Sequence, residues 1–179
     1  MLAWMIAERA RVGRATTVGA ATGAVAGLAT ITPASGFVQP WGALLIGAAA
    51  GVVCFVAVLA RGRLDYDDSL DVVGVHMVGG VLGVVLTGAF ASLAINSAGV
   101  AASVDQFGRQ VVLAVVTVAY SFAATMILLK ITDVVVGLRV SAQAESEGLD
   151  LSQHGEVGYR WSDLPDEVSE PSPVTQPPQ

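Results

Sequence analysis

The sequence predicts an all-α membrane protein, a polytopic helix bundle of about four full transmembrane helices preceded by a partial one. Hydrophobic residues make up 54% of the 179 positions and charged residues only 13%, and the mean hydropathy is +0.66. A soluble domain of this length cannot bury so large an apolar fraction, so the surplus indicates a lipid bilayer. Long uncharged stretches separated by short polar breaks divide the chain into spans.

The first residues, MLAWMIAERARVGR, place their apolar stretch before their positive charges. A cleaved signal peptide has the reverse order, so none is predicted. The apolar stretch is also far shorter than the roughly 20 residues that a span needs. We therefore expect the last turns of a helix that ends at Glu8.

Two spans are predicted within the uncharged stretch that ends at Ala60, because this stretch is too long for one crossing. The break is indicated by TPASG at 32–36 and by QP at 39–40, since proline and glycine interrupt a helix. The predicted spans lie near 16–32 and 41–60.

A third span is predicted near 68–94 and a fourth near 110–136, with a polar loop between them. A polar tail at 137–159 follows. The end at 160–179 is rich in proline and acidic residues and is predicted to be disordered.

The basic residues predict the orientation. Four crossings put three basic clusters on one side, which the positive-inside rule makes cytoplasmic. These clusters are Arg9, Arg11 and Arg14; Arg61 and Arg63; and Lys130 and Arg139. The prediction is a multi-pass protein of the cell membrane whose C-terminus is cytoplasmic.

Glycines recur four residues apart on three of the predicted spans. They are Gly19, Gly23 and Gly27; Gly47 and Gly51; and Gly79 and Gly83. Helices without side chains at such positions can approach closely, and dispersion and weak backbone contacts then hold them together. Tight helix packing is the expected role of each stripe, and the lining of a pore is the alternative.

Composition argues against several functional classes. The net charge is −6 and nine of the 15 acidic residues lie at or beyond Asp133, so there is no basic surface for nucleic acid. Cys54 is the only cysteine, which argues against a disulfide framework or a cysteine-based metal site. A single histidine in the spans, without an attacking serine or a second intramembrane acid, leaves no nucleophile–base pair. No enzyme, metal or cofactor is predicted.

A lone histidine, His76, interrupts the apolar run DVVGVHMVGG at 71–80. If Asp68 caps this helix, His76 lies about 12 Å along its axis. It is either a packed histidine bonded to a neighbouring helix or a proton-exchanging group that lines a substrate path. The cost of burying an ionisable group in hydrocarbon favours the second interpretation. By three- and four-residue spacing, the residues expected on its face are Val72, Val73, Gly79, Gly80, Gly83 and Thr87.

Three blocks resemble the ammonium transporter family (Amt/Mep/Rh). Its eighth and ninth helices are matched by residues 22–55, TGAVAGLATITPASGFVQPWGALLIGAAAGVVCF. Its tenth helix is matched by residues 67–91, DDSLDVVGVHMVGGVLGVVLTGAFA. KITDVVVGLRVSAQAESEGLDLSQHGEVGY at 130–159 resembles the end of its eleventh helix and its cytoplasmic tail. The most specific elements are D-x-x-D-V-x-G-V-H and the tail pattern G-L-R-V…E-G-L-D…H-G-E…Y.

This resemblance implies the second half of an eleven-helix inverted-repeat fold, from the end of the seventh helix to the cytoplasmic tail. It implies transport of ammonium or ammonia, with His76 as the second of two paired pore histidines. Val72 would lie near the lower pore wall, and Asp68 and Asp71 would support the start of the helix.

For the tail, the resemblance implies a folded regulatory segment that packs on neighbouring subunits of a homotrimer and couples to a PII-type signal protein. The matching residues are Gly137, Leu138, Arg139, Glu147, Gly148, Leu149, Asp150, His154, Gly155, Glu156 and Tyr159. The residues alone favour a solvated end in which SAQAESEGLD forms one short helix. Such a helix would begin at about Ser141 and stop at Gly148, where glycine can adopt a positive φ.

The first pore histidine of the family has no counterpart in this sequence, since the only other histidine is His154. The chain is therefore interpreted as a fragment, with a misplaced start or a split gene as possible origins. The alternative is a non-conducting or regulatory membrane subunit that assembles with a separately encoded partner.

Overall fold

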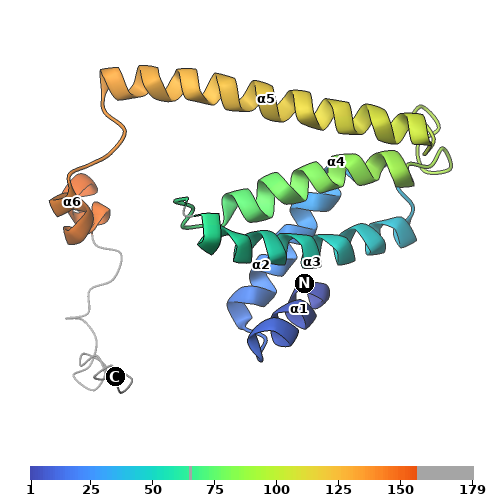
Figure 1. The fold of residues 1–179 in the computed structure, drawn as a ribbon, viewed down its shortest axis with the longest axis horizontal. Coiled ribbons are helices and arrows are strands. Elements are labelled where there is room, and N and C mark those ends of the chain that lie inside the picture. The colour runs from blue at the N-terminus through green and yellow to red at the C-terminus, as the bar shows by residue number, and fades with distance from the viewer. Residues whose placement is uncertain (65, 157–179) are drawn as a thin grey trace. The chain divides into compact units, whose positions relative to one another are not determined.

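The computed structural model describes residues 1–64 and 66–156 (Figure 1). Its helical segments are α1 (Leu2–Val12), α2 (Thr17–Ile31), the 3₁₀-turn η1 (Thr32–Ala34), α3 (Pro40–Leu64), the π-turn η2 (Val73–Met77), α4 (Val78–Phe90), α5 (Val104–Val135), α6 (Ala142–Glu147) and the π-turn η3 (Asp150–His154). The only β-pairing in the described residues is an isolated antiparallel bridge between Val38 and Ala91. The chain divides into two compact units, Met1–Ala123 and Ala124–Gln179.

Within residues 1–64 and 66–156, four helical segments are long and apolar enough to cross a membrane. They are Thr17–Ala34, Pro40–Leu64, Val73–Phe90 and Val104–Val135. The predicted fold class, a mostly helical membrane protein with about four spans, is thereby confirmed. α1 has only 11 residues, too few to span a bilayer.

The first helix ends at Val12, one turn beyond the predicted Glu8. Gly13 forms the end, because its φ of +88° allows its N–H to donate to the carbonyl of Arg9 at 2.9 Å. Glu8 lies inside the helix, and its carboxylate accepts hydrogen bonds from Thr16 N–H at 3.1 Å and from Thr16 Oγ1 at 2.8 Å. This carboxylate ties the end of α1 to the start of α2.

The last transmembrane helix begins at Val104, six residues before the predicted 110. The reason is a cap, because Ser103 Oγ accepts the N–H of Gln106 at 3.0 Å. Apolar character marks the part of a helix inside the bilayer, whereas caps of this kind lie in the polar sequence outside it.

Two other ends also differ from the predicted spans. α3 continues to Leu64, four residues past the predicted 60. α4 ends at Phe90, four residues before the predicted 94, because Ala91 turns to an extended ψ of 137°.

The core of the first unit lies among α1, α2, α3 and η2, with a second cluster at the other end of α3. The first cluster consists of Trp4, Ala26, Cys54, Phe55 and Val75. The second consists of Ala34, Val38 and Ile46. The rings of Trp4 and Phe55 pack edge to face with their centroids 5.4 Å apart, which fixes α1 against α3.

The predicted glycine stripes contain both contact positions and open positions. A Cβ atom at Gly51 would lie 2.8 Å from a backbone nitrogen of α1, and one at Gly79 would lie 2.7 Å from Thr30 Oγ1. A Cβ atom at Gly27 or Gly47 would meet nothing within 4 Å in the described chain. Tight packing therefore explains Gly51 and Gly79, and it does not explain Gly27 or Gly47.

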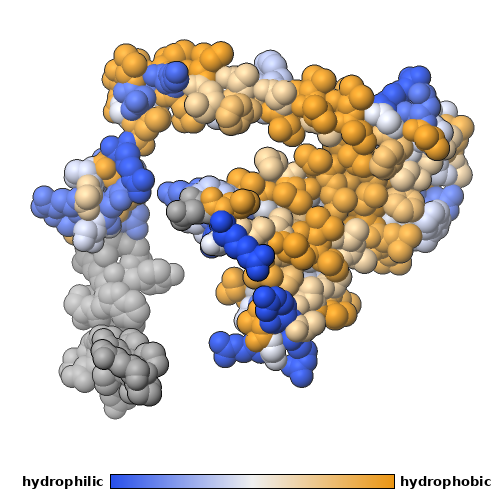
Figure 2. Space-filling view, in the orientation of Figure 1, coloured by the Kyte–Doolittle hydropathy of each residue, from blue (hydrophilic) through white to orange (hydrophobic). Residues whose placement is uncertain are grey.

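Apolar side chains cover much of the visible surface of the helices, whereas hydrophilic residues gather near their ends and in the tail (Figure 2). On α5, Ala114 is the one buried residue. An apolar surface of this extent is typical of a protein that contacts lipid or further protein in the membrane.

Candidate functional site

A tight turn from Asp68 to Asp71 leads from α3 into the helix that carries His76. The N–H of Asp71 donates to the carbonyl of Asp68 at 3.3 Å. Asp71 has a φ of +55°, the one positive value among the non-glycine residues that the structure describes. This left-handed conformation costs about 1 kcal/mol for a residue with a side chain. The surrounding contacts therefore have to hold the turn in place.

The carboxylate of Asp68 caps the helix that follows. Its Oδ1 accepts the N–H of Val72 and its Oδ2 accepts the N–H of Val73, both at 2.8 Å. The first N–H groups of a helix have no partner inside the helix, and a negative charge there also complements the helix dipole. Asp68 supplies both effects at the start of this helix.

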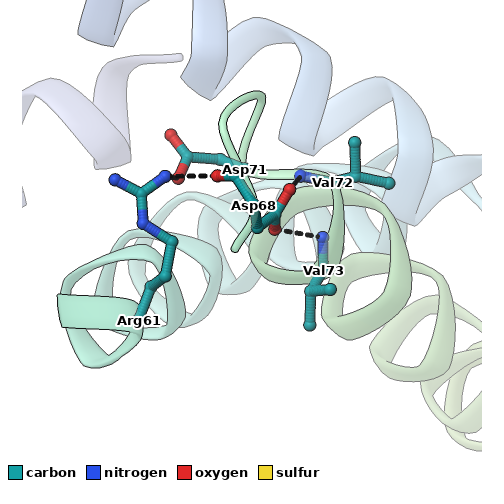
Figure 3. A network of polar contacts seen from close by, with 5 residues as sticks. All are labelled: Arg61, Asp68, Asp71, Val72 and Val73. Carbon is teal, nitrogen blue, oxygen red and sulfur yellow. Dashed lines mark hydrogen bonds and ion pairs between the residues drawn. The ribbon is translucent and has the colours of Figure 1, made fainter. Parts of the chain in front are cut away.

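Arg61, in the last turn of α3, contacts both ends of the turn (Figure 3). Its Nη1 donates to the carbonyl of Asp68 and to Asp71 Oδ1, the latter at 2.6 Å. The side chains of Arg61 and Asp71 are 36% and 27% exposed, so solvent screens this pair less than it screens a fully exposed one.

One face of α3 packs against the segment η2 that follows it in the chain. This face carries Cys54, Val58 and Arg61, which are four and three residues apart. A Cβ atom at Gly74 would lie 2.8 Å from Val58 Cγ2, so the two backbones approach closely. Cys54 Sγ donates a weak hydrogen bond to the carbonyl of Val75 at 3.8 Å. η2 is therefore fixed against α3 just beyond the Arg61 contact.

His76 lies in the π-turn η2. Its side chain is exposed in this chain, as are those of Val72 and Met77. Among the described residues, its imidazole has no hydrogen-bond or ion-pair partner. A histidine whose role is to pack would bond to a neighbouring helix, and this one does not do so within the described residues. π-turns are rare and are frequent at functional sites.

The face predicted around His76 is wrong in part. Gly79, Gly83 and Thr87 are buried, and Gly79 and Gly83 lie against α2 and η1, whereas His76 is exposed. A π-turn contains more residues per turn than an α-helix. The three- and four-residue spacing of a regular helix therefore does not extend through η2.

In the second unit, the tail contains two short helical segments. Ser141 Oγ accepts the N–H of Ala144 at 3.2 Å and caps α6, and Gly148 ends α6 with a φ of +92°. The hydroxyl of Ser152 donates to the carbonyls of Ala144 at 3.1 Å and Gly148 at 2.9 Å. This hydroxyl links η3 to α6.

Polar contacts join several predicted tail residues. Arg139 Nε lies 2.7 Å from Glu145 Oε1. The hydrogen bond from Arg139, and then its charge, hold the pKa of Glu145 below its usual 4.5. Glu147 accepts a hydrogen bond at 3.0 Å from a glutamine one turn before it. The N–H of Glu156 donates to the carbonyl of Asp150 at 3.0 Å.

The other predicted tail residues are exposed side chains and glycines. Gly137 and Gly155 have φ values of +81° and +66°. The exposed side chains are those of Leu138, Leu149 and His154. Tyr159 and the end at 160–179 lie outside the described residues.

The sequence pattern identifies Arg61 only as a positive charge that sets orientation, and it does not predict the contacts of Arg61 with Asp68 and Asp71. The available signal was a side-chain stripe at helical spacing, formed by Cys54, Val58 and Arg61, shortly before a pair of aspartates three residues apart. The carbonyl contact to Asp68 left no such signal, because it depends on the path of the turn.

The known sequences that match this chain are ammonium transporters. The family model for the Ammonium Transporter Family matches residues 1–159. The chain is 45% identical over 172 residues to an ammonium transporter of Mycobacterium tuberculosis, covering 90% of this chain and 36% of that protein. It is also 45% identical over 158 residues to ammonium transporter Amt1 of Archaeoglobus fulgidus, covering 87% of this chain and 40% of Amt1.

Solved structures are similar as well. The crystal structure of Saccharomyces cerevisiae Mep2 matches with a TM-score of 0.73 and 38% identity, over 79% of this chain and 34% of Mep2. Candida albicans Mep2 matches with a TM-score of 0.73 and 33% identity, over 85% of this chain and 36% of that protein. The chain thus spans between a third and two fifths of the length of these relatives, and it belongs to the ammonium transporter family.

Proposed function

We propose that this chain forms part of a path for ammonium or ammonia across the cell membrane, with His76 as the polar group in that path. The observation that carries the proposal is the exposure of this imidazole together with its lack of a bonded partner among the described residues. It is the only ionisable side chain between Val72 and Val104, it is exposed on a π-turn, and it has no partner among the described residues. The relatives named above carry the name ammonium transporter, which supports the choice of substrate.

The chemistry of a neutral imidazole suits this substrate. It offers one N–H donor and one acceptor nitrogen, so it can accept a hydrogen bond from ammonium or donate one to the lone pair of ammonia. Val72 is proposed to line the path next to His76, and Asp68 and Asp71 are proposed to hold the helix start.

The test is uptake of radiolabelled methylammonium in cells that lack their own ammonium transporters. The chain is expressed alone and together with the N-terminal part of Archaeoglobus fulgidus Amt1. We expect saturable uptake in at least one arrangement, inhibited by unlabelled ammonium. Correctly inserted protein without uptake in either arrangement would contradict the proposal and would favour a non-conducting subunit.

We further propose a cytoplasmic tail, assembly as a homotrimer, and binding of a PII-type signal protein by the tail at 137–159. The positive-inside distribution supports the sidedness, and the α6–η3 contacts support a folded segment. Labelling of single cysteines introduced at Gln143 and at Ala98 tests the sidedness. An impermeant maleimide added outside intact cells should react at Ala98→Cys and not at Gln143→Cys. The native Cys54 is fully buried and should stay unlabelled.

A further inference from the structure

We propose that Arg61 is the positioning residue for His76, because it fixes where the His76 helix begins and how the imidazole is presented. The proposal rests on the pore role proposed above for His76. Arg61 itself is 15 residues earlier in the chain, on α3, and the proposal requires no contact between Arg61 and the transported species.

The turn that Arg61 holds does not follow from local preference. Asp71 has a φ of +55°, a conformation that aspartate and asparagine adopt more readily than other residues with a side chain but that still costs free energy, so contacts around it stabilise the turn. Arg61 Nη1 contacts the backbone at one end of the turn, through the Asp68 carbonyl, and the side chain at the other end, through Asp71 Oδ1. Both contacts come from one rigid, permanently charged group. Arg61 therefore holds the two ends of this turn together.

The turn from Asp68 to Asp71 is connected directly to the π-turn that contains His76. Asp68 caps Val72 and Val73 with its two carboxylate oxygens, and the N–H of Val75 donates to the carbonyl of Asp71 at 2.9 Å. Each of these bonds requires Asp68 and Asp71 to keep their positions. If the turn opens, the cap is lost and the first turn of the helix can frame-shift to regular α-helical bonding. Since a π-turn differs from α-helix by its bonding offset, such a shift would rotate His76 away from its present direction.

The α3 face provides the second fixed point. Close packing of Gly74 on Val58 prevents the start of η2 from sliding along α3. With Arg61 at one end and Val58 in the middle, the segment from Asp68 to His76 is held at two places on one rigid helix.

The experiment measures the chain itself, reconstituted in lipid nanodiscs, by NMR. Arg61→Gln removes the charge, and Asp71→Asn removes the carboxylate while keeping a residue that tolerates positive φ. We expect the His76 imidazole resonances to shift in both variants. Amide exchange at Val72 and Val73 should accelerate by roughly tenfold or more, since the cap opens. The resonances of His154, in the tail, and of the Trp41 indole, at the opposite end of α3, should not move.

Arg63→Gln is the matched control, because Arg63 lies two residues further in the same last turn and forms no ion pair among the described residues. It removes the same charge and should leave the His76 and Val72 signals unchanged. Arg61→Lys should restore part of the wild-type His76 signature. The double variant Arg61→Gln/Asp71→Asn should be no worse than Arg61→Gln alone, because Arg61→Gln already removes the contact with Asp71 as well as the contact with the Asp68 carbonyl.

Three outcomes would each overturn the proposal. The His76 resonances could stay unchanged in Arg61→Gln, or Arg63→Gln could shift them as much as Arg61→Gln does. In the double variant, the shifts of the two single variants could add. These readouts do not require transport. A chain without methylammonium uptake but with these shifts would contradict the proposed function and leave the positioning role intact. If Arg61→Gln does not fold, the same comparison is made with Arg61→Lys and Asp71→Asn.

Discussion

At the scale of single residues, His76 combines three properties that rarely coincide. It is ionisable, it lies within a segment apolar enough to span a bilayer, and its side chain is exposed in this chain. An intramembrane group of this kind is costly unless it serves transport or bonds a partner. Its removal therefore separates a functional role from a packing role.

We predict that His76→Ala reduces methylammonium uptake by about tenfold or more, the loss expected when a hydrogen bond to a charged species is removed. The folded yield should change little, because an exposed side chain without a bonded partner among the described residues contributes little to packing. Uptake per molecule is measured against folded protein quantified by size-exclusion chromatography. His154→Ala in the tail is the control. A variant with normal uptake and a reduced folded yield would assign His76 to packing.

The Arg139–Glu145 pair gives a prediction about pH. Arg139 lowers the pKa of Glu145 below 4.5, so the folded tail binds the proton more weakly than the unfolded tail does. The contribution of this pair to stability is therefore complete above pH 4.5 and is lost as the pH falls through the lowered pKa. An NMR titration of the Glu145 carboxyl carbon should show this midpoint below 4.5. Arg139→Gln should return it towards the usual value, and an identical midpoint in both proteins would refute the assignment.

At the scale of helices, close approach at particular glycines holds the first unit together. Gly51 and Gly47 lie on the same helix one turn apart, yet only Gly51 faces α1. Sequence periodicity treats the two positions as equivalent, because both belong to one small-residue stripe. The difference arises because α1 packs against α3 at Gly51 and not at Gly47.

We predict that Gly51→Ala destabilises the bundle by about 1–3 kcal/mol, the usual cost of forcing a methyl group into a filled interface. The new Cβ would lie 2.8 Å from the backbone nitrogen of Trp4. Gly47→Ala should be neutral or should stabilise α3 by up to about 1 kcal/mol, because alanine favours helix and the space is open. Thermal unfolding of both variants in the same detergent provides the comparison. Equal melting temperatures would mean that α1 does not pack on α3 as described.

At the scale of the whole molecule, the chain consists of an apolar first unit and a polar tail in the second unit, and these can be tested separately. Membrane insertion depends on the apolar spans and the distribution of arginines. Regulation, as proposed, depends on the tail. A substitution in the tail should therefore change activity without changing insertion.

We predict that Gly148→Asp leaves insertion intact and abolishes or deregulates uptake in the assembled transporter. Gly148 has a φ of +92° and a ψ of 134°, a combination that glycine adopts and other residues avoid, so α6 and η3 should lose their link through Ser152. Gln153→Asp adds the same charge at an exposed neighbouring position and is the control. Protease accessibility and uptake are measured together. Wild-type uptake with an unchanged cleavage pattern in Gly148→Asp would show that the tail is passive.

The sequence by itself determined the fold class and the number of candidate spans in the described residues, because hydropathy is a property of composition. It also singled out His76 as an isolated ionisable residue, whose role stays a prediction. It located the helix from Ser141 to Gly148, since capping residues act locally. It misplaced the end of the first helix and the start of the last one, because polar caps such as Ser103 lie outside the apolar segments that periodicity detects.

Only the tertiary structure decided the surroundings of His76. The π-turn, the positive φ of Asp71 and the two contacts of Arg61 depend on how α3 meets the segment that follows it. The separation of Gly51 from Gly47 likewise depends on which helix lies opposite. Such features arise from contacts between segments distant in sequence, and no local pattern of hydrophobicity or charge encodes the direction in which those segments approach.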